Sequence, residues 1–180
     1  MCGSQRECIA RHNHIRDVLF TTASSANLGP TKEERALIPG RGNKPADILI
    51  PHWAKGRAAA LDVTVVNPLA PSYLTHSKNT AGYAMEQAFT RKYREVGAAC
   101  RAEGIEFIPM PTESLGGMHD TTVQQVKKLG AALALSSGSD QAEQTKFLFQ
   151  MISLLQKRDI ASLILNRNPE TISPEVDGIA

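Results

Sequence analysis

The chain has 180 residues, of which 42% are hydrophobic and 21% are charged, and its formal net charge is +2. This composition excludes a disordered chain, and the length suits one domain with a hydrophobic core. The small net charge excludes a broad polycationic surface, so contacts with nucleic acid must come from local basic clusters. No apolar run approaches the roughly 18 residues of a membrane span. Three cysteines and no secretory leader predict a reducing compartment without a disulfide framework.

The first residues carry Cys2 and Cys8, followed by His12 and His14. A structural zinc site needs four such ligands and usually begins with a closely spaced cysteine pair. The spacing C-x5-C-x3-H is a weaker pattern. We therefore interpret Cys2 and Cys8 as candidate ligands of an incomplete zinc site whose other half would belong to a longer chain.

Apolar residues recur at helical spacing through residues 13–27, which predicts the first helix, with Asn13 as its N-cap. Basic side chains gather at its start, namely Arg11, His12 and Arg16. Two interpretations remain open for them. They form either a solvated basic turn or a phosphate-binding cluster that a helix N-terminus would assist.

Short strands are expected at residues 31–38, 45–51 and 58–66, with a loop over 52–57. The second and third strands each hold an aspartate within an apolar run, Asp47 and Asp62. Buried carboxylates are rare unless they are paired or bind a metal. A hairpin that pairs Pro51 with Ala58 places Asp47 directly opposite Asp62, with Cβ atoms about 4.5–5.5 Å apart. Such carboxylates repel each other unless a cation lies between them, and a hard divalent ion suits oxygen ligands.

A long helix is expected over residues 77–102, and its apolar stripe is interrupted by a lysine. Lys92 comes three residues after Phe89 and four before Val96, so it points where a core residue belongs. One interpretation is a lysine whose ammonium extends out of an apolar face to water. The other is a lysine aimed at the carboxylate pair on the sheet.

The remaining pattern predicts a strand at residues 105–109, helices at 119–136 and 141–165, and a loose tail at 169–180. The expected fold class is α/β (α+β), with the element order α-β-β-β-α-β-α-α.

This order resembles the restriction-endonuclease-like nuclease core, the PD-(D/E)xK superfamily. The sequence P-A-D at 45–47 and D-V-T at 62–64 matches its motif loosely, with Thr64 where a lysine is usual. A closer resemblance is to the endonuclease domain that follows reverse transcriptase in R2-type and related retroelements. In that family K-P-D precedes a second acidic residue, and the lysine lies on the next helix. Here Lys44-Pro45-Ala46-Asp47 has one extra residue, 14 residues separate the two aspartates, and Lys92-Tyr93 falls on the next helix.

Further runs are similar to animal retroelement reading frames, and the likeness extends from about Cys2 to about Pro169. These runs are Arg11-His12-Asn13, Ile15-Arg16-Asp17, Leu61-Asp62-Val63-Thr64-Val65, Asn67-Pro68 and Leu115-Gly116-Gly117-Met118. The resemblance implies a central four-stranded mixed sheet flanked by helices. It also implies a zinc-knuckle remnant at 1–12, an endonuclease-like domain at 13–168 and a flexible tail at 169–180.

The implied activity is Mg²⁺-dependent hydrolysis of DNA phosphodiester bonds, with Mn²⁺ as a substitute, to nick target DNA. Asp47 and Asp62 would hold the metal with the backbone carbonyl of Val63, and Lys92 would complete the catalytic set. Additional site candidates are Glu33, Thr64 and Tyr93, and the candidate nucleic-acid contacts are Arg11, His12, Arg16 and Lys44. The expected partners are DNA and the reverse-transcriptase part of a longer polyprotein, in the nucleus and without a membrane. Zn²⁺ is expected only with a complete knuckle, which includes Cys2 and Cys8.

Two other interpretations remain open at this stage. Thr64 in the lysine position also fits a catalytically inactive, nucleic-acid-binding relic of the same fold. Alternatively, the chain is a small α/β domain whose aspartates cap turns or pair with Arg41 and Arg57.

Overall fold

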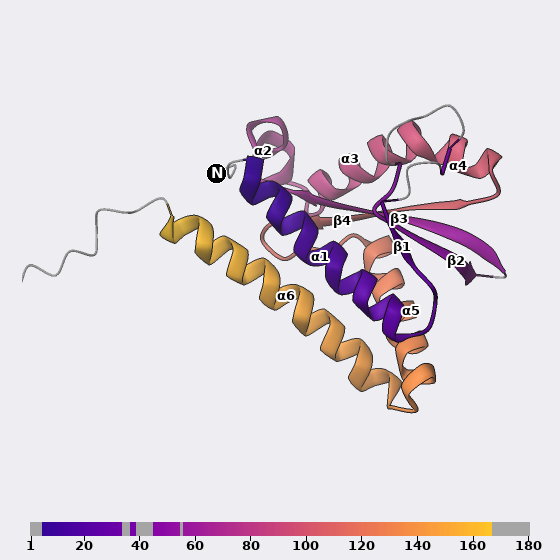
Figure 1. Cartoon of the computed structure of the whole chain (residues 1–180). Coiled ribbons are helices and arrows are strands. Elements are labelled where there is room, and N and C mark those ends of the chain that lie inside the picture. The colour runs from indigo at the N-terminus through magenta and orange to yellow at the C-terminus, as the bar shows by residue number, and fades with distance from the viewer. Residues whose placement is uncertain (1–4, 34–36, 39–44, 55, 167–180) are drawn as a thin grey trace, which may run out of the picture.

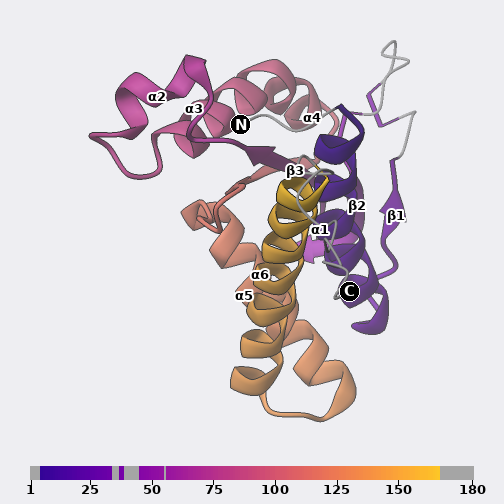
Figure 2. The ribbon, with the colours of Figure 1, turned by 90° about the vertical axis from the view of Figure 1, so that its left-hand side faces the viewer.

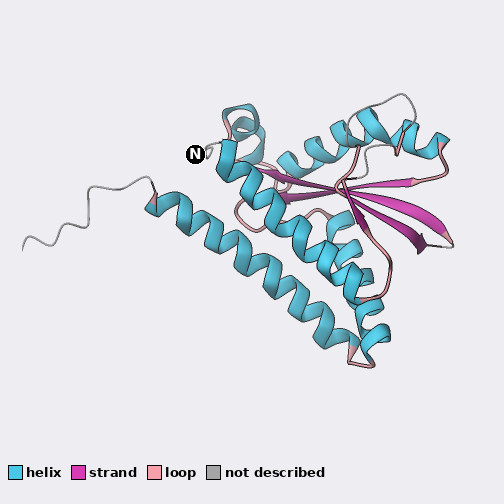
Figure 3. Cartoon of the chain, in the orientation of Figure 1, coloured by secondary structure: helices cyan, strands magenta, loops and turns pink. Residues whose placement is uncertain are grey.

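The computed structural model describes residues 5–33, 37–38, 45–54 and 56–166. Helices cover both faces of one mixed sheet (Figures 1 and 3). The elements are α1 (Gln5–Ser25), β1 (Thr31–Lys32), β2 (Ile48–Ala54), β3 (Arg57–Val66), α2 (Pro71–Ser77), α3 (Tyr83–Lys92), the π-helical turn η1 (Tyr93–Gly97), α4 (Ala98–Ala102), β4 (Glu106–Glu113), α5 (Asp120–Ser137) and α6 (Gln141–Leu165).

The four strands are ordered β1-β2-β3-β4 across the sheet. The first three form an antiparallel meander, and β4 runs parallel to β3. A parallel neighbour requires a long crossover connection, and α2, α3, η1 and α4 supply it. The expected mixed α/β fold with a four-stranded sheet is therefore confirmed.

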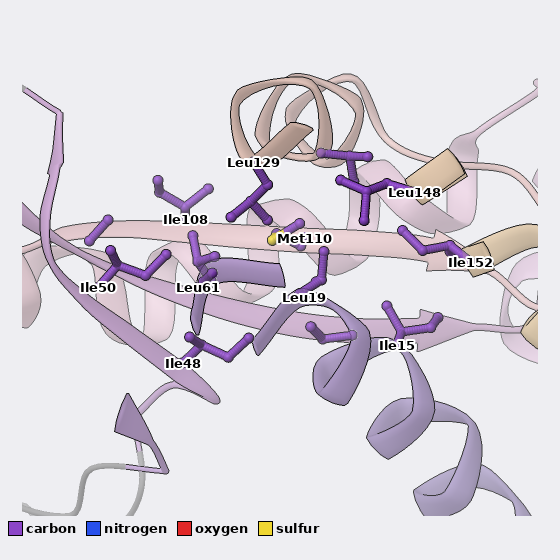
Figure 4. Close-up of a cluster of buried hydrophobic side chains, with 14 residues drawn as sticks. Ile15, Leu19, Ile48, Ile50, Leu61, Ile108, Met110, Leu129, Leu148 and Ile152 are labelled. Atoms are coloured by element: carbon purple, nitrogen blue, oxygen red, sulfur yellow. The ribbon is translucent and has the colours of Figure 1, made fainter. Parts of the chain in front are cut away.

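The two faces of the sheet pack against different helices (Figures 1 and 2). Alternate residues of β3 point to opposite faces. Leu61 and Val63 join the main core, to which α1, α5 and α6 contribute side chains such as Leu19, Leu129 and Ile152 (Figure 4). Ala60 belongs to a second cluster on the other face, beneath η1 and α4. Asp62 lies two residues after Ala60 on the same strand, so its side chain points to the same face and toward the α3–α4 layer.

The β2–β3 hairpin has the predicted register. Ile48 pairs with Leu61, and Ile50 pairs with Ala59. The paired residues begin at Ile48, and the N–H of Asp47 donates to the Leu61 carbonyl, so Asp47 and Asp62 are neighbours without being a ladder pair. The predicted Pro51–Ala58 pair is wrong, because the register shifts between Ile50 and Ala54. Proline donates no ladder hydrogen bond and is tolerated at such irregularities. The predicted loop at 52–57 is also wrong, since β2 continues to Ala54 and β3 begins at Arg57.

Several predicted boundaries are wrong for local reasons. The first helix begins at Gln5 and not at Asn13, which lies inside α1. Residues 5–12 are mostly polar, so no apolar period marks that part of the helix. Of the described residues in the predicted strand at 31–38, only those of β1 form a strand, and the backbone at Glu33 has a positive φ of 52°. The strand predicted at 105–109 extends to Glu113.

The helix predicted at 77–102 is divided. α2 ends at Ser77, and α3 begins only after Gly82, whose φ of 77° is left-handed. A glycine adopts this conformation without the steric penalty of a Cβ atom. The predicted helix at 141–165 matches α6, and α5 lies one residue later than predicted. The tail at 169–180 lies outside the described residues. None of the described helices has the length and apolarity needed to cross a membrane.

The α5–α6 contact supplies a test of the packing. A Cβ atom on Gly130 would lie 2.5 Å from the Thr145 Oγ1 and 2.9 Å from its Cα. We expect Gly130→Ala to destabilise the chain by about 1–3 kcal/mol through overpacking, although alanine favours helices more than glycine. Urea unfolding measures this free energy, with the exposed Lys127→Ala as the control on the same helix. An equal or higher stability of Gly130→Ala would contradict the close approach.

Candidate active site at the junction of β2, β3 and α3

Asp62 lies in the middle of β3, where its residue surface is 6% exposed. The Lys92 ammonium lies 3.0 Å from its Oδ2 and 3.1 Å from its Oδ1. The Thr64 hydroxyl donates a longer hydrogen bond of 3.3 Å to Oδ2. Both Asp62 oxygens therefore accept hydrogen bonds, and one donor carries a full positive charge.

Asp47 directly precedes β2 and is fixed by its backbone and by its side chain. Its N–H donates to the Leu61 carbonyl over 3.0 Å, and its own carbonyl accepts from the Glu33 N–H over 2.9 Å. Its Oδ2 accepts a 2.7 Å hydrogen bond from the Val63 N–H. The Asp47 carboxylate thus accepts a backbone hydrogen bond that a carbonyl of the neighbouring strand would accept in a regular sheet. This bond holds the carboxylate beside Asp62.

His12 reaches this site from α1. Its Nε2 lies 3.0 Å from the Asp47 Oδ1, and its side chain is 28% exposed. The hydrogen bond to Asp47 is the main reason that the pKa of His12 is raised above 6.5, although burial opposes the shift. We call Asp47, Asp62, Lys92 and His12 the carboxylate cluster.

Sequence reasoning assigned His12 to phosphate contact and missed its place beside Asp47. A helix that began at residue 13 gave no reason to place His12 over the sheet. The sequence signal for this position is the polar run that precedes Asn13. If that run is interpreted as the first turns of the same helix, His12 lies on a helix that covers the sheet.

Burial dominates the electrostatics of Asp62. It raises the pKa of the carboxyl group above its ordinary value, and the neighbouring charge of Asp47 raises it further. The Lys92 charge and the hydrogen bonds from Lys92 and Thr64 oppose this effect without reversing it. The negative charge of Asp62 is therefore under-compensated by the chain itself, which favours any additional cation at this point.

The π-helical turn explains how Lys92 faces the sheet. Lys92 comes four residues after the buried Ala88, as an α-helical stripe requires, and five residues before the buried Gly97. A five-residue step is the spacing of a π turn, and such turns are frequent at functional sites. The side of the helix that faces the sheet therefore includes Ala88, then Lys92, and then Gly97 after the π turn.

The donor set of the cluster fits a hydrated Mg²⁺ ion. In the part of the chain that the structure describes, no three or more His, Cys, Asp or Glu side chains form a group that could hold a metal. Mg²⁺ does not need such a group, because it keeps several waters and commonly binds through one or two carboxylates and substrate phosphates. Asp47 and Asp62 are the residues that would hold it.

The other candidate residues are directed elsewhere. The Glu33 carboxylate lies 2.6 Å from an Arg16 nitrogen, and Arg16 also contacts Asp17 at 2.9 Å. Arg16 is thereby largely neutralised by its own neighbours. The Tyr93 hydroxyl accepts a hydrogen bond from Arg101.

Arg11 is buried, with its residue surface 8% exposed, and donates to the Cys8 sulfur over 3.5 Å. Its burial within the protein removes it from a surface that could grip phosphate. Cys8 lies within α1. Lys44, Cys2 and Arg41 lie outside the described residues.

Comparison with protein-family models gives no match for this chain, and comparison with curated proteins gives none either.

Asp62 supplies a test of the local electrostatics. Because its pKa is raised in the folded state, the charged form destabilises the fold at pH values above the unfolded pKa of 3.8. We expect Asp62→Asn to raise Tm at pH 7 without metal by about 2–4 °C, equivalent to ~1 kcal/mol for a chain of this size. The advantage should vanish below pH 3.8, where Asp62 is protonated in both states. Calorimetric melts measure this change in Tm, with Asp120→Asn as the control. A lower Tm for Asp62→Asn than for wild type would contradict the under-compensated charge.

His12 supplies a test with the opposite charge. Its raised pKa means that protonated His12 contributes stability below pH 6.5, and that this contribution is lost as pH rises through the folded-state pKa. We expect the stability difference between wild type and His12→Gln to be largest under acidic conditions and to shrink at alkaline pH. Urea unfolding at pH values on either side of 6.5 measures it. A difference that does not change with pH would show that the ion pair with Asp47 is absent.

Proposed function

We propose that this chain hydrolyses phosphodiester bonds in DNA, with Mg²⁺ held by Asp47 and Asp62 and with Lys92 as the catalytic lysine. The observation that carries the proposal is the Lys92 ammonium, which lies 3.0 Å from the buried Asp62 carboxylate, a group close enough to Asp47 to feel its charge. Two carboxylates and a lysine are the minimum set of a metal-dependent nuclease of the restriction-endonuclease-like type.

Each residue of the cluster has a role in this mechanism. Bound Mg²⁺ lowers the pKa of a water ligand and offsets charge that develops on the phosphate. Asp47 is held in one orientation by the Val63 N–H and by His12. Lys92 extends from the end of α3 with its side chain 30% exposed, so its ammonium can orient the attacking water and stabilise negative charge at the scissile phosphate.

Lys92 also supplies the ammonium group that is missing at position 64, where the motif usually has a lysine and this chain has Thr64. The usual lysine follows the second acidic residue by two positions on the same strand, and here that position donates a hydroxyl to Asp62. The ammonium comes instead from α3 and reaches the same carboxylate. We therefore propose a restriction-endonuclease-like core of the retroelement type, which acts on nuclear DNA within a longer polyprotein that includes a reverse transcriptase.

One observation favours the inactive relic as a second candidate. All four oxygens of Asp47 and Asp62 accept hydrogen bonds from donors of the chain, which are His12, Val63, Lys92 and Thr64. Such a network also serves as a metal-free clamp that holds α1 and α3 to the sheet. In that case the carboxylate cluster stabilises the fold and does not cut.

A plasmid-nicking assay tests the proposal. With Mg²⁺ we expect wild type to convert supercoiled plasmid to the open circular form, and EDTA to abolish the reaction. Lys92→Met and Asp47→Asn should each lower the rate by roughly 10²-fold or more, the scale of losing one group that stabilises transition-state charge. Lys146→Met removes an equal charge from an exposed position of α6 and should leave the rate unchanged.

The second candidate predicts a different pattern. If wild type shows no Mg²⁺-dependent nicking, or if Lys92→Met and Lys146→Met nick at the same rate, the catalytic role of the cluster is wrong. Retained DNA binding by all variants would then support the relic.

A further inference from the structure

A groove follows the outer edge of β4, and its lining residues come from the α3–α4 layer, from β4 and from α5. β4 is the last strand in the sheet order, and no fifth strand covers its edge among the residues described. The groove encloses about 450 Å³. Sites for ligands of small-molecule size typically enclose roughly 300–1,000 Å³. The groove therefore admits a nucleotide-sized unit and is far too small for a double helix.

Three cations line this groove from three different elements. Arg57 comes from the start of β3, Arg101 from α4 and Lys128 from α5, while Glu106 is the one acidic residue in the lining. Within the described ranges, no carboxylate forms a salt bridge with any of these three cations. Their charges converge on one concave surface and are not neutralised there, which favours a ligand with several negative charges.

Two stacked aromatic rings line the same groove. Phe89 and Tyr93 both line it, and their ring centroids are 6.0 Å apart with planes inclined by 10°. His119 also stacks on Phe89, at 4.7 Å and 10°, and is not itself part of the groove lining. The Arg101 guanidinium lies 6.0 Å from the Tyr93 ring centroid. Flat rings beside a basic groove are what proteins use to stack bases and hold the phosphates of single-stranded nucleic acid.

The edge of β4 is poorly suited to a peptide. Pro109 and Pro111 are two residues apart and so direct their backbone groups to the same side of the strand. The Pro111 carbonyl accepts from the His119 N–H and from the Thr122 hydroxyl, which identifies this side as the one away from β3. Prolines present no N–H there, and prolines at a sheet edge prevent the pairing of an added strand.

We propose that this groove binds a segment of single-stranded nucleic acid. Arg57, Arg101 and Lys128 contact its phosphates, and a base stacks against the exposed Tyr93 ring. This role goes beyond the proposed nuclease activity and requires no metal at Asp47 or Asp62.

The groove and the carboxylate cluster are close neighbours in the fold. Tyr93 directly follows Lys92, and Pro109 on β4 pairs with Asp62 on β3. Adjacent strands lie about 4.8 Å apart. A strand bound at the β4 edge therefore lies one β-strand away from the strand that carries Asp62.

Fluorescence anisotropy in EDTA tests this inference, with a short labelled oligothymidylate and a duplex of equal length as probes. Lys128→Gln is compared with Lys127→Gln, because Lys127 precedes it on α5, is exposed and lies outside the groove. We expect the single strand to bind more tightly than the duplex. Lys128→Gln should weaken binding of the single strand by about threefold or more and reduce the salt slope by ~0.7, the value for one lost phosphate contact. Lys127→Gln should change neither quantity.

Tyr93→Leu provides a second and independent variant. It should weaken binding without a change in salt slope, since stacking releases no counterions. Undetectable binding of the single strand at low salt would overturn the inference, and so would equal binding of the duplex. Equal effects of Lys127→Gln and Lys128→Gln would also overturn it. Because EDTA removes divalent metal, failure here leaves the nicking experiment undecided, and failure of nicking leaves this result standing.

Discussion

The buried negative charge of Asp62 is the constraint on which the site depends. A carboxylate removed from water destabilises the fold unless positive charge and hydrogen-bond donors surround it. The structure provides Lys92 at 3.0 Å and the Thr64 hydroxyl, yet the pKa of Asp62 remains raised because its burial and the neighbouring Asp47 outweigh both. A site left under-compensated in this way is typical of functional centres, where stability is given up for chemistry.

The end of α3 connects the two functional surfaces that we propose. Lys92 is the last residue of α3 and faces the sheet, whereas Tyr93 is the first residue of the π-helical turn and lines the groove at the β4 edge. The π turn lets the buried stripe continue from Ala88 through Lys92 to Gly97 with one extra residue. Val96, the residue before Gly97, is also partly buried against the second cluster.

Much of the sheet was predictable because its signals are local. Alternation of apolar residues on both sides of a short turn fixes which residues of β2 and β3 oppose each other, such as Ile48 and Leu61. The sequence also singled out Lys92 within an apolar helical stripe and left two interpretations of it, between which the 3.0 Å contact with Asp62 decides. These inferences used neighbouring residues whose spacing is set by backbone geometry.

The contact between His12 and Asp47 could not be predicted in the same way. It joins residues far apart in the sequence, and it depends on how α1 lies across the sheet. The π turn and the register shift near Pro51 also escaped prediction, because they arise from packing and not from periodicity. Arg16 and Glu33 were each assigned a functional partner, but they bind each other, which sequence spacing does not reveal.

Manganese binding followed by electron paramagnetic resonance tests the central claim most directly, because Mn²⁺ replaces Mg²⁺ at oxygen sites and free Mn²⁺ gives a distinct signal. The account predicts that wild type binds Mn²⁺ at millimolar or lower concentration and that Asp62→Asn abolishes this binding. Lys92→Met should bind Mn²⁺ more tightly than wild type, since it removes the cation that competes for the same oxygens. Equal Mn²⁺ binding by wild type and Asp62→Asn, or no binding by either, would contradict a metal site at the carboxylate cluster.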